Sequence, residues 1–245
     1  MFLKFFLILA FCSRNIFSIY NGFEADIKMW SFIASVRING YHECGGTVIE
    51  SRIILTAAQC VAGIAADNVS IQVGTDDRTK GKGRVVPVTS IIVHDKFLKN
   101  SAPNDIALLW LKWTALAGIV RKLPIVEEEP ADQNFCSNAG WGEQSLQILG
   151  MPRLLLHGMA KVRNRSYCDE ELVEQVGEEL LCTFYNQYDI CPGDYGGPLI
   201  YGGFVVGIAV EGHGCGWSKL PSLYTNVYKF RDWIETNSKK LIENK

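Results

Sequence analysis

The stretch Cys191-Pro192-Gly193-Asp194-Tyr195-Gly196-Gly197-Pro198-Leu199 is the most informative part of the chain. It places one acid and one phenol among three glycines and two prolines, a composition typical of a tight loop. A few residues later, Phe204-Val205-Val206-Gly207-Ile208 is a short apolar run rich in β-branched residues, which predicts a strand. The stretch therefore predicts a glycine-rich loop among β-strands.

Similar short runs recur along the chain and are separated by Gly, Asn, Asp and Pro. They include residues 32–36, 52–55 and 69–73. This spacing favours an all-β barrel or sandwich. The exception is the segment 226–241, where apolar residues recur at intervals of three and four residues beside charged ones, as in Val227, Phe230, Trp233 and Ile234. That pattern predicts an amphipathic helix, which we expect to pack on the last barrel.

The first 18 residues predict a secretory signal peptide. The chain has 245 residues, of which 48% are hydrophobic, enough for one large or two small cores. Its amino terminus has one lysine before an uncharged apolar run, Phe5 to Cys12, which is too short to span a bilayer. Cleavage after Ser18 would leave Ile19 as the new amino terminus, and an earlier cut near Ser13 stays open. We therefore expect a secreted protein with no membrane anchor.

Charge and cysteine usage narrow the function classes. The formal net charge is −2, and removing residues 1–18 with their two cations makes it −4, so we expect no nucleic-acid binding. The eight cysteines include no Cys-x-x-Cys pair and no Cys/His cluster, so no metal site is expected. Cys12 leaves with the signal, so seven cysteines remain, and one is left without a partner in the chain. The sequons at Asn68 and Asn164 could carry glycans or be unused surface residues.

Three motifs in order carry a family resemblance. They are Leu55-Thr56-Ala57-Ala58-Gln59-Cys60, Asn104-Asp105-Ile106-Ala107-Leu108 and Gly193-Asp194-Tyr195-Gly196-Gly197-Pro198. With Gly140-Trp141-Gly142 and Pro221, they resemble the histidine, aspartate and serine motifs of the trypsin-like serine proteases. The resemblance extends from about Ile19 to Glu235. It implies two six-stranded antiparallel β-barrels of the chymotrypsin type with a C-terminal α-helix, divided as residues 19–130 and 131–245.

Two of the three triad positions depart from the family pattern. Gln59 stands for the base histidine, and a carboxamide cannot accept a proton near neutral pH. Tyr195 stands for the serine nucleophile, and a phenol with a pKa of about 10 is almost wholly protonated at pH 7. Asp105 is retained, and we expect it to be a buried carboxylate held by backbone donors and by Gln59. His42 is expected to be structural. The sequence therefore predicts a pseudoprotease with no functional catalytic residue.

The resemblance also assigns a remnant of the substrate cleft. Asp189 falls where trypsin-like members hold the acid that pairs with a substrate Lys or Arg. We expect a narrowed pocket with Tyr195 closing its entrance. Ile19 and Asp194 match the pair of mature amino terminus and aspartate that orders the oxyanion loop. The other positions of the remnant cleft are Ile190, Gly193, Glu211, Gly212 and Ser222.

By the same resemblance, three disulfides are expected: Cys44 with Cys60, Cys168 with Cys182, and Cys191 with Cys215. Cys136 is then the unpaired cysteine. A buried inert thiol is favoured there over a bridge to a second chain, because free cysteines are commonly buried. We accordingly expect a monomer.

Residues 47–63, the disulfide set and the ending Phe230 to Glu235 give a narrower resemblance, to the scabies mite inactivated serine protease paralogues related to the mite trypsin-like allergens. It implies a secreted binding protein without cofactors that inhibits host complement. Three alternatives stay open: a residual or noncanonical hydrolase, a decoy for protease inhibitors, and an adaptor in a protease cascade.

Overall fold

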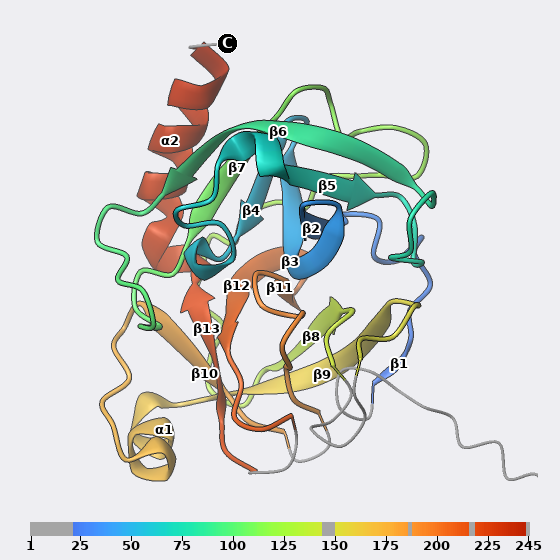
Figure 1. Cartoon of the computed structure of the whole chain (residues 1–245). Helices are drawn as coiled ribbons and strands as arrows, with labels where there is room; N and C mark the ends of the chain where they lie inside the picture. Colours follow the sequence, from blue (N-terminus) through green and yellow to red (C-terminus); the bar gives the residue numbers. More distant parts are fainter. Residues whose placement is uncertain (1–21, 144–149, 186–187, 216–218, 244–245) are drawn as a thin grey trace, which may run out of the picture.

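A computed structural model describes residues 22–143, 150–185, 188–215 and 219–243 of the chain. The predicted signal peptide and Ile19 lie outside these ranges. The described strands form two closed antiparallel barrels, one above the other in Figure 1, with the C-terminal helix along one side of the upper barrel. The predicted two-barrel architecture is confirmed.

The first barrel closes in the order β2-β3-β4-β7-β6-β5. Closure leaves no free edge for another chain to pair with. β6 shows the alternation that a barrel wall requires, since Val86 and Val88 are buried while Val85 and Pro87 are exposed. The bounds are β2 (Ile33–Ile38), β3 (Tyr41–Glu50), β4 (Ile53–Thr56), β5 (Val69–Val73), β6 (Arg84–Val93) and β7 (Ala107–Leu111).

The second barrel is closed by the pairing of β8 with both β9 and β11. A short strand, β1 (Phe23–Glu24), adds to the outside of β9, so the start of the described chain belongs structurally to the second barrel. The predicted division at residue 130 falls between β7 and β8. The bounds are β8 (Phe135–Gly140), β9 (Leu156–Arg163), β10 (Leu180–Thr183), β11 (Pro198–Tyr201), β12 (Phe204–Glu211) and β13 (Ser222–Asn226).

The C-terminal helix is present, and the predicted packing on the last barrel is confirmed for its first turn but wrong for the rest. A 3₁₀ turn, η3 (Val227–Phe230), lies on β12 of the second barrel and leads into α2 (Arg231–Glu243), which contacts β7 of the first barrel. His94, at the end of β6, meets the rings of Phe230 and Trp233, each at 5.2 Å. Because η3 redirects the chain, the apolar face of α2 covers the first barrel and ties the two barrels together.

One further helix was not expected from the sequence. α1 (Arg165–Leu172) begins after Asn164, whose side-chain oxygen accepts a hydrogen bond from the Tyr167 N–H at 2.9 Å. This is N-terminal capping, and asparagine is among the best residues for it. Two 3₁₀ turns, η1 (Ala58–Cys60) and η2 (Ala66–Asn68), follow β4. No helix in the described ranges is long and apolar enough to cross a membrane.

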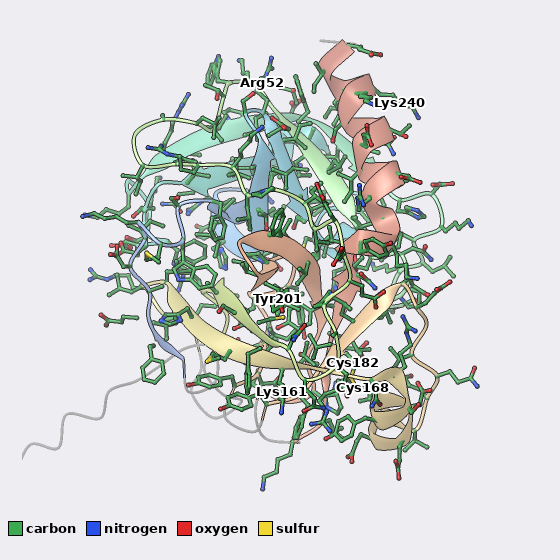
Figure 2. All side chains as sticks on the ribbon, turned by 180° about the vertical axis from the view of Figure 1, so that it is seen from behind. Arg52, Lys161, Cys168, Cys182, Tyr201 and Lys240 are labelled. Carbon is green, nitrogen blue, oxygen red and sulfur yellow. A yellow bond between two sulfur atoms is a disulfide. The ribbon has the colours of Figure 1, made fainter. Side chains whose placement is uncertain are left out.

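Two of the three predicted disulfides are confirmed. Cys44–Cys60 ties β3 to η1, and Cys168–Cys182 ties α1 to β10 (Figure 2). The third prediction was wrong in this structure, because Cys191 and Cys215 are buried free thiols. They meet through a hydrogen bond, and this bond, burial and the charge of Asp194 raise the pKa of the Cys191 thiol. The two thiols thus lie side by side, the placement that the predicted pairing requires, but without a covalent bond between them.

Cys136 is a buried free thiol, as the sequence predicted. Burial raises its pKa to about 12. We expect iodoacetamide at pH 8 to leave Cys136 unmodified in the folded protein and to label it in 8 M urea, because only the thiolate reacts. Peptide mapping by mass spectrometry measures the difference. Full labelling without urea would contradict the buried placement.

Candidate functional site

Gln59 and Asp105, 46 positions apart in the sequence, form a tightly bonded pair. The Gln59 backbone N–H donates to Asp105 Oδ1 at 2.8 Å, and its side-chain Nε2 donates to Oδ2 at 2.6 Å. Gln59 Nε2 also donates to the carbonyl oxygen of Val210 on β12, at 2.8 Å. Both amide hydrogens are therefore used, and the side chain bridges the two barrels. Asp105 is held as the sequence predicted, by backbone donors and by Gln59.

Burial dominates the electrostatics of Asp105. It raises the pKa of the carboxyl group to about 6, and the hydrogen bonds from Gln59 and Ala58 oppose that rise. On the other side, the Thr225 hydroxyl donates to the Asp105 carbonyl oxygen at 2.7 Å. Every contact fixes the position of this acid, and none of them supplies a group that can take up a proton at pH 7. The pair thus joins the two barrels, and Gln59 contributes no proton acceptor to it.

Tyr195 is half-buried in the loop between β10 and β11. Its backbone carbonyl accepts a hydrogen bond from the Gly45 N–H at 2.8 Å, which anchors the loop on β3. Burial raises the pKa of its phenol to about 12, although the Gly212 backbone N–H donates to it. The phenol therefore points to the wall formed by β12 and stays protonated at physiological pH.

His42 is the nearest alternative base, but both of its ring nitrogens already have hydrogen-bond partners. Its Nδ1 lies 2.8 Å from the Ser35 hydroxyl and its Nε2 lies 3.0 Å from the Gly193 carbonyl oxygen. Burial lowers its pKa to about 4, so the ring is neutral at pH 7. A neutral ring with a partner on each nitrogen orders the loop. The sequence prediction of a structural histidine agrees with this geometry.

Asp194 is fully buried beneath the same loop. Its Oδ1 accepts from the Gly142 N–H at 2.7 Å and its Oδ2 from the Cys191 N–H at 3.0 Å. Burial raises its pKa to about 7. A methyl group on Gly140 or Gly142 would overlap this carboxylate, so both positions require glycine. The predicted partner, Ile19, lies outside the described residues, so the pair stays a prediction.

A residue that the sequence did not single out covers the oxyanion loop. Gly193 has a φ of +96°, and a side chain there would come within 2.8 Å of the Met151 Cε and 2.9 Å of the Gly142 Cα. The Met151 thioether thus lies directly over Gly193. Sequence reasoning could not find it, because this contact depends on a loop from the second barrel and not on a motif.

Ile190 and Gly212, two predicted positions of the remnant cleft, lie in contact. A side chain on Gly212 would overlap the Ile190 carbonyl oxygen and lie 3.0 Å from the Ile190 Cγ1. Asp189 is buried and accepts a hydrogen bond from the Ser222 hydroxyl at 2.5 Å. The cavity at Asp189 measures only about 20 Å³, and its lining residues do not include Tyr195 or Gly212.

A separate cleft of about 420 Å³ lies in front of the Gln59–Asp105 pair. Glu211 lines it and faces His213, with Oε1 at 3.4 Å from Nε2. His213 Nδ1 also lies 2.8 Å from the Pro221 carbonyl oxygen. The hydrogen bond with Glu211 raises the pKa of His213, and the same bond lowers that of Glu211. The cleft is lined in addition by Gln59, Phe97, Lys99, Asp105, Tyr195 and Gly212.

The structure thus brings the three motif positions to one place. Gln59, Asp105 and Tyr195 all line the cleft, with Glu211 and Gly212, while Asp189 and Ser222 lie in the separate small cavity. No group of three or more metal-ligating side chains occurs among the described residues. Both sequon asparagines, Asn68 and Asn164, are exposed, and the side chain of Asn164 also caps α1.

The chain is similar to known proteins over most of its length. Residues 19–234 match the family described as Trypsin. The chain is 32% identical to hypodermin-B of Hypoderma lineatum over 90% of its own length and 88% of that protein. It is 29% identical to trypsin beta of Drosophila erecta with the same coverage, and 28% identical to trypsin alpha of Drosophila melanogaster over 91% of its length and 88% of that protein.

Proposed function

Because the chain belongs to the trypsin family of serine proteases, we propose that it is a secreted member that has lost peptide hydrolysis and acts by binding other proteins. The observation that carries the proposal is the bridge from Gln59 to Asp105 and Val210. It occupies the place of the family's base histidine with a group that cannot accept a proton. Tyr195 adds a protonated phenol where the nucleophilic hydroxyl is required.

The narrower resemblance to the scabies mite inactivated protease paralogues supplies the partner class of this proposal. We propose host complement components as the partners. Inhibition of complement by binding differs from proteolysis in its stoichiometry. A binding protein inhibits in proportion to the amount added and leaves the chains of its target intact.

Hydrolysis of peptide and ester substrates by the purified mature protein tests the loss of activity. Removal of either the nucleophile or the base of a hydrolase triad lowers turnover by about six orders of magnitude, and removal of both adds little. We therefore expect no rate above the uncatalysed background, with active trypsin as the positive control. Turnover that disappears in the Asp105→Ala variant would overturn the proposal in favour of a noncanonical hydrolase.

Benzamidine binding tests the state of the primary pocket. Asp189 is buried in a cavity of only about 20 Å³ and does not line the cleft, so we expect no binding of benzamidine at 1 mM by isothermal titration calorimetry. In an open pocket the amidinium would pair with the carboxylate of Asp189. Binding in the micromolar range would instead favour a decoy for protease inhibitors, because a decoy needs an accessible pocket.

A complement assay then tests the partner class. We expect wild-type protein to reduce lysis of antibody-coated erythrocytes in human serum, with an extent set by its molar ratio and not by the preincubation time. Electrophoresis should detect no cleaved complement chains. Unchanged lysis at a large molar excess would reject complement as the target and leave the adaptor role in a protease cascade.

A further inference from the structure

A cationic loop joins β5 to β6. Residues 78–84 read Arg-Thr-Lys-Gly-Lys-Gly-Arg, with four cations and no acid in a chain whose formal net charge is −2. Lys80 and Lys82 are exposed and Arg84 is half-buried. Figure 1 shows this loop at the end of the first barrel that lies away from α2. Its charge is opposite in sign to that of the chain as a whole.

The segment 151–155 of the second barrel extends this cationic loop. The Arg78 backbone N–H donates to the Arg153 carbonyl oxygen at 3.0 Å. The Arg78 guanidinium donates to the carbonyl oxygens of Pro152 at 2.5 Å and Met151 at 2.6 Å. The Arg153 side chain is 66% exposed. Lys80, Lys82 and Arg153 are thus exposed on two adjoining segments, one from each barrel, and Arg84 ends the first segment; we call these four residues the cationic surface.

Two further cations, Arg37 and Arg78, lie beside this cationic surface, and the structure describes no ion pair of either with a carboxylate. Arg37 donates to Gln72 Oε1 at 2.5 Å, to the Arg78 carbonyl oxygen at 2.9 Å and to the Gly40 carbonyl oxygen. The described ion pairs include no partner for Arg37 or Arg78. The charges of Arg37 and Arg78 act on a nearby group, since both help to lower the pKa of His42.

Carboxylates nearby neutralise little of this charge. Asp77 is buried, and its Oδ1 accepts hydrogen bonds from the Thr79 backbone at 2.9 Å and hydroxyl at 2.6 Å. Its Oδ2 lies 3.8 Å from the Arg153 guanidinium, a loose pair. The adjacent acid in the sequence is Asp76, whose carbonyl oxygen binds Trp141 and Leu155. Six cations thus face two carboxylates, which leaves a local excess of positive charge.

We propose that this cationic surface docks an acidic segment of a partner polypeptide. Arginine and lysine clusters recognise acidic motifs through charge-assisted hydrogen bonds. The cations are distributed over two segments, which suits a row of carboxylates better than a single anion. Gly81 has open space where a side chain would be, so its backbone is accessible to a peptide backbone between the two lysines. This surface lies outside the cleft, so the inference holds whether or not the cleft is inactive.

Binding of a fluorescein-labelled peptide of six Asp-Glu repeats to the mature protein tests the proposal. We expect saturable binding by fluorescence anisotropy at 50 mM NaCl that weakens at least tenfold at 500 mM NaCl, because the Debye length shortens from about 14 Å to about 4 Å. A peptide of Asn-Gln repeats should not bind. The double variant Lys80→Glu/Lys82→Glu should lose at least tenfold in affinity.

The matched control is Lys96→Glu/Lys240→Glu, which makes the same change in net charge at exposed positions away from the loop. Lys240 lies on α2 (Figure 2). We expect this control variant to change the affinity for the acidic peptide by less than threefold. Both double variants should melt at the wild-type temperature. Equal losses in the two variants would reduce the effect to net charge and overturn the proposal. Binding of a heparin fragment without binding of the acidic peptide would also overturn it.

Discussion

The double variant Gln59→His/Tyr195→Ser is expected to hydrolyse a nitrophenyl ester at least 100-fold faster than the wild-type protein. Positioned general-base assistance contributes about 10² to 10⁴ in rate, and the serine restores a nucleophile that the base can activate. Asp105 is already in place to orient the new histidine, because it now accepts two hydrogen bonds from residue 59. Initial rates at pH 8 measure the gain.

Selectivity for basic substrates should require a further change. In the double variant Ile190 would still touch Gly212, and the Ser222 hydroxyl would still occupy Asp189. Adding Ile190→Ser and Ser222→Gly should remove side-chain volume beside Gly212 and the hydrogen bond that Ser222 donates to the Asp189 carboxylate. We expect kcat/KM for an arginine ester to rise roughly tenfold to 100-fold, since a hydrogen bond to a charged group contributes about 1.5–3 kcal/mol.

The single variants are the controls for this experiment. Gln59→His alone lacks a nucleophile and Tyr195→Ser alone lacks a base, so neither should exceed wild type by more than a few fold. A silent double variant that also shows a lower melting temperature would point to misfolding. A stable double variant that remains silent on the ester would show that the oxyanion loop under Met151 is not competent, and would contradict the expectation.

The sequence predicted the parts of the site that depend on long motifs. Gln59, Asp105 and Tyr195 lie in motifs whose order matches the family, and the structure places all three along one cleft. The two confirmed disulfides join cysteines 16 and 14 residues apart. These features follow from the family resemblance that the motifs carry, since the cysteine spacing alone would allow many pairings.

Other features depend on contacts between distant segments. The contact between Ile190 and Gly212 results from loop positions that no periodicity encodes. The thiols of Cys191 and Cys215 lie among buried acids, which sequence spacing does not reveal. Which face of α2 packs on the first barrel depends on the direction in which η3 leaves β13. Asn164 caps α1, whereas the sequence predicted only a glycan acceptor or an unused surface residue there.

The variant Gln59→Glu is expected to lose about 3 kcal/mol of unfolding free energy at pH 8, the order of magnitude for an uncompensated buried charge. It replaces the Nε2 donor by a second carboxylate, 2.6 Å from Asp105 Oδ2 and 2.8 Å from the Val210 carbonyl oxygen. Two carboxylates at this distance cannot both be ionised without a large penalty, so one pKa of the pair rises strongly. Urea unfolding measures the loss.

The loss should shrink as the pH falls toward 5. In the wild type, burial holds the Asp105 pKa at about 6, above its ordinary value of 3.8, so its ionisation penalty is complete above pH 6 and absent below pH 3.8. In Gln59→Glu the folded pair binds a proton more tightly still. The folded variant therefore takes up a proton that the unfolded chain does not, and stability relative to wild type rises as the pH decreases.

Gln59→Ala separates the charge effect from the loss of the bridge. It removes both Nε2 hydrogen bonds but adds no charge, so its destabilisation should change much less between pH 8 and pH 5 than that of Gln59→Glu. Taking differences from wild type also cancels the other buried groups with shifted pKa values, Asp194 and His42, which are common to all three proteins. A loss in Gln59→Glu that stayed constant from pH 8 to pH 5 would mean that residue 59 does not face the Asp105 carboxylate. The proposed replacement of a proton acceptor by a structural amide would then lose its physical basis.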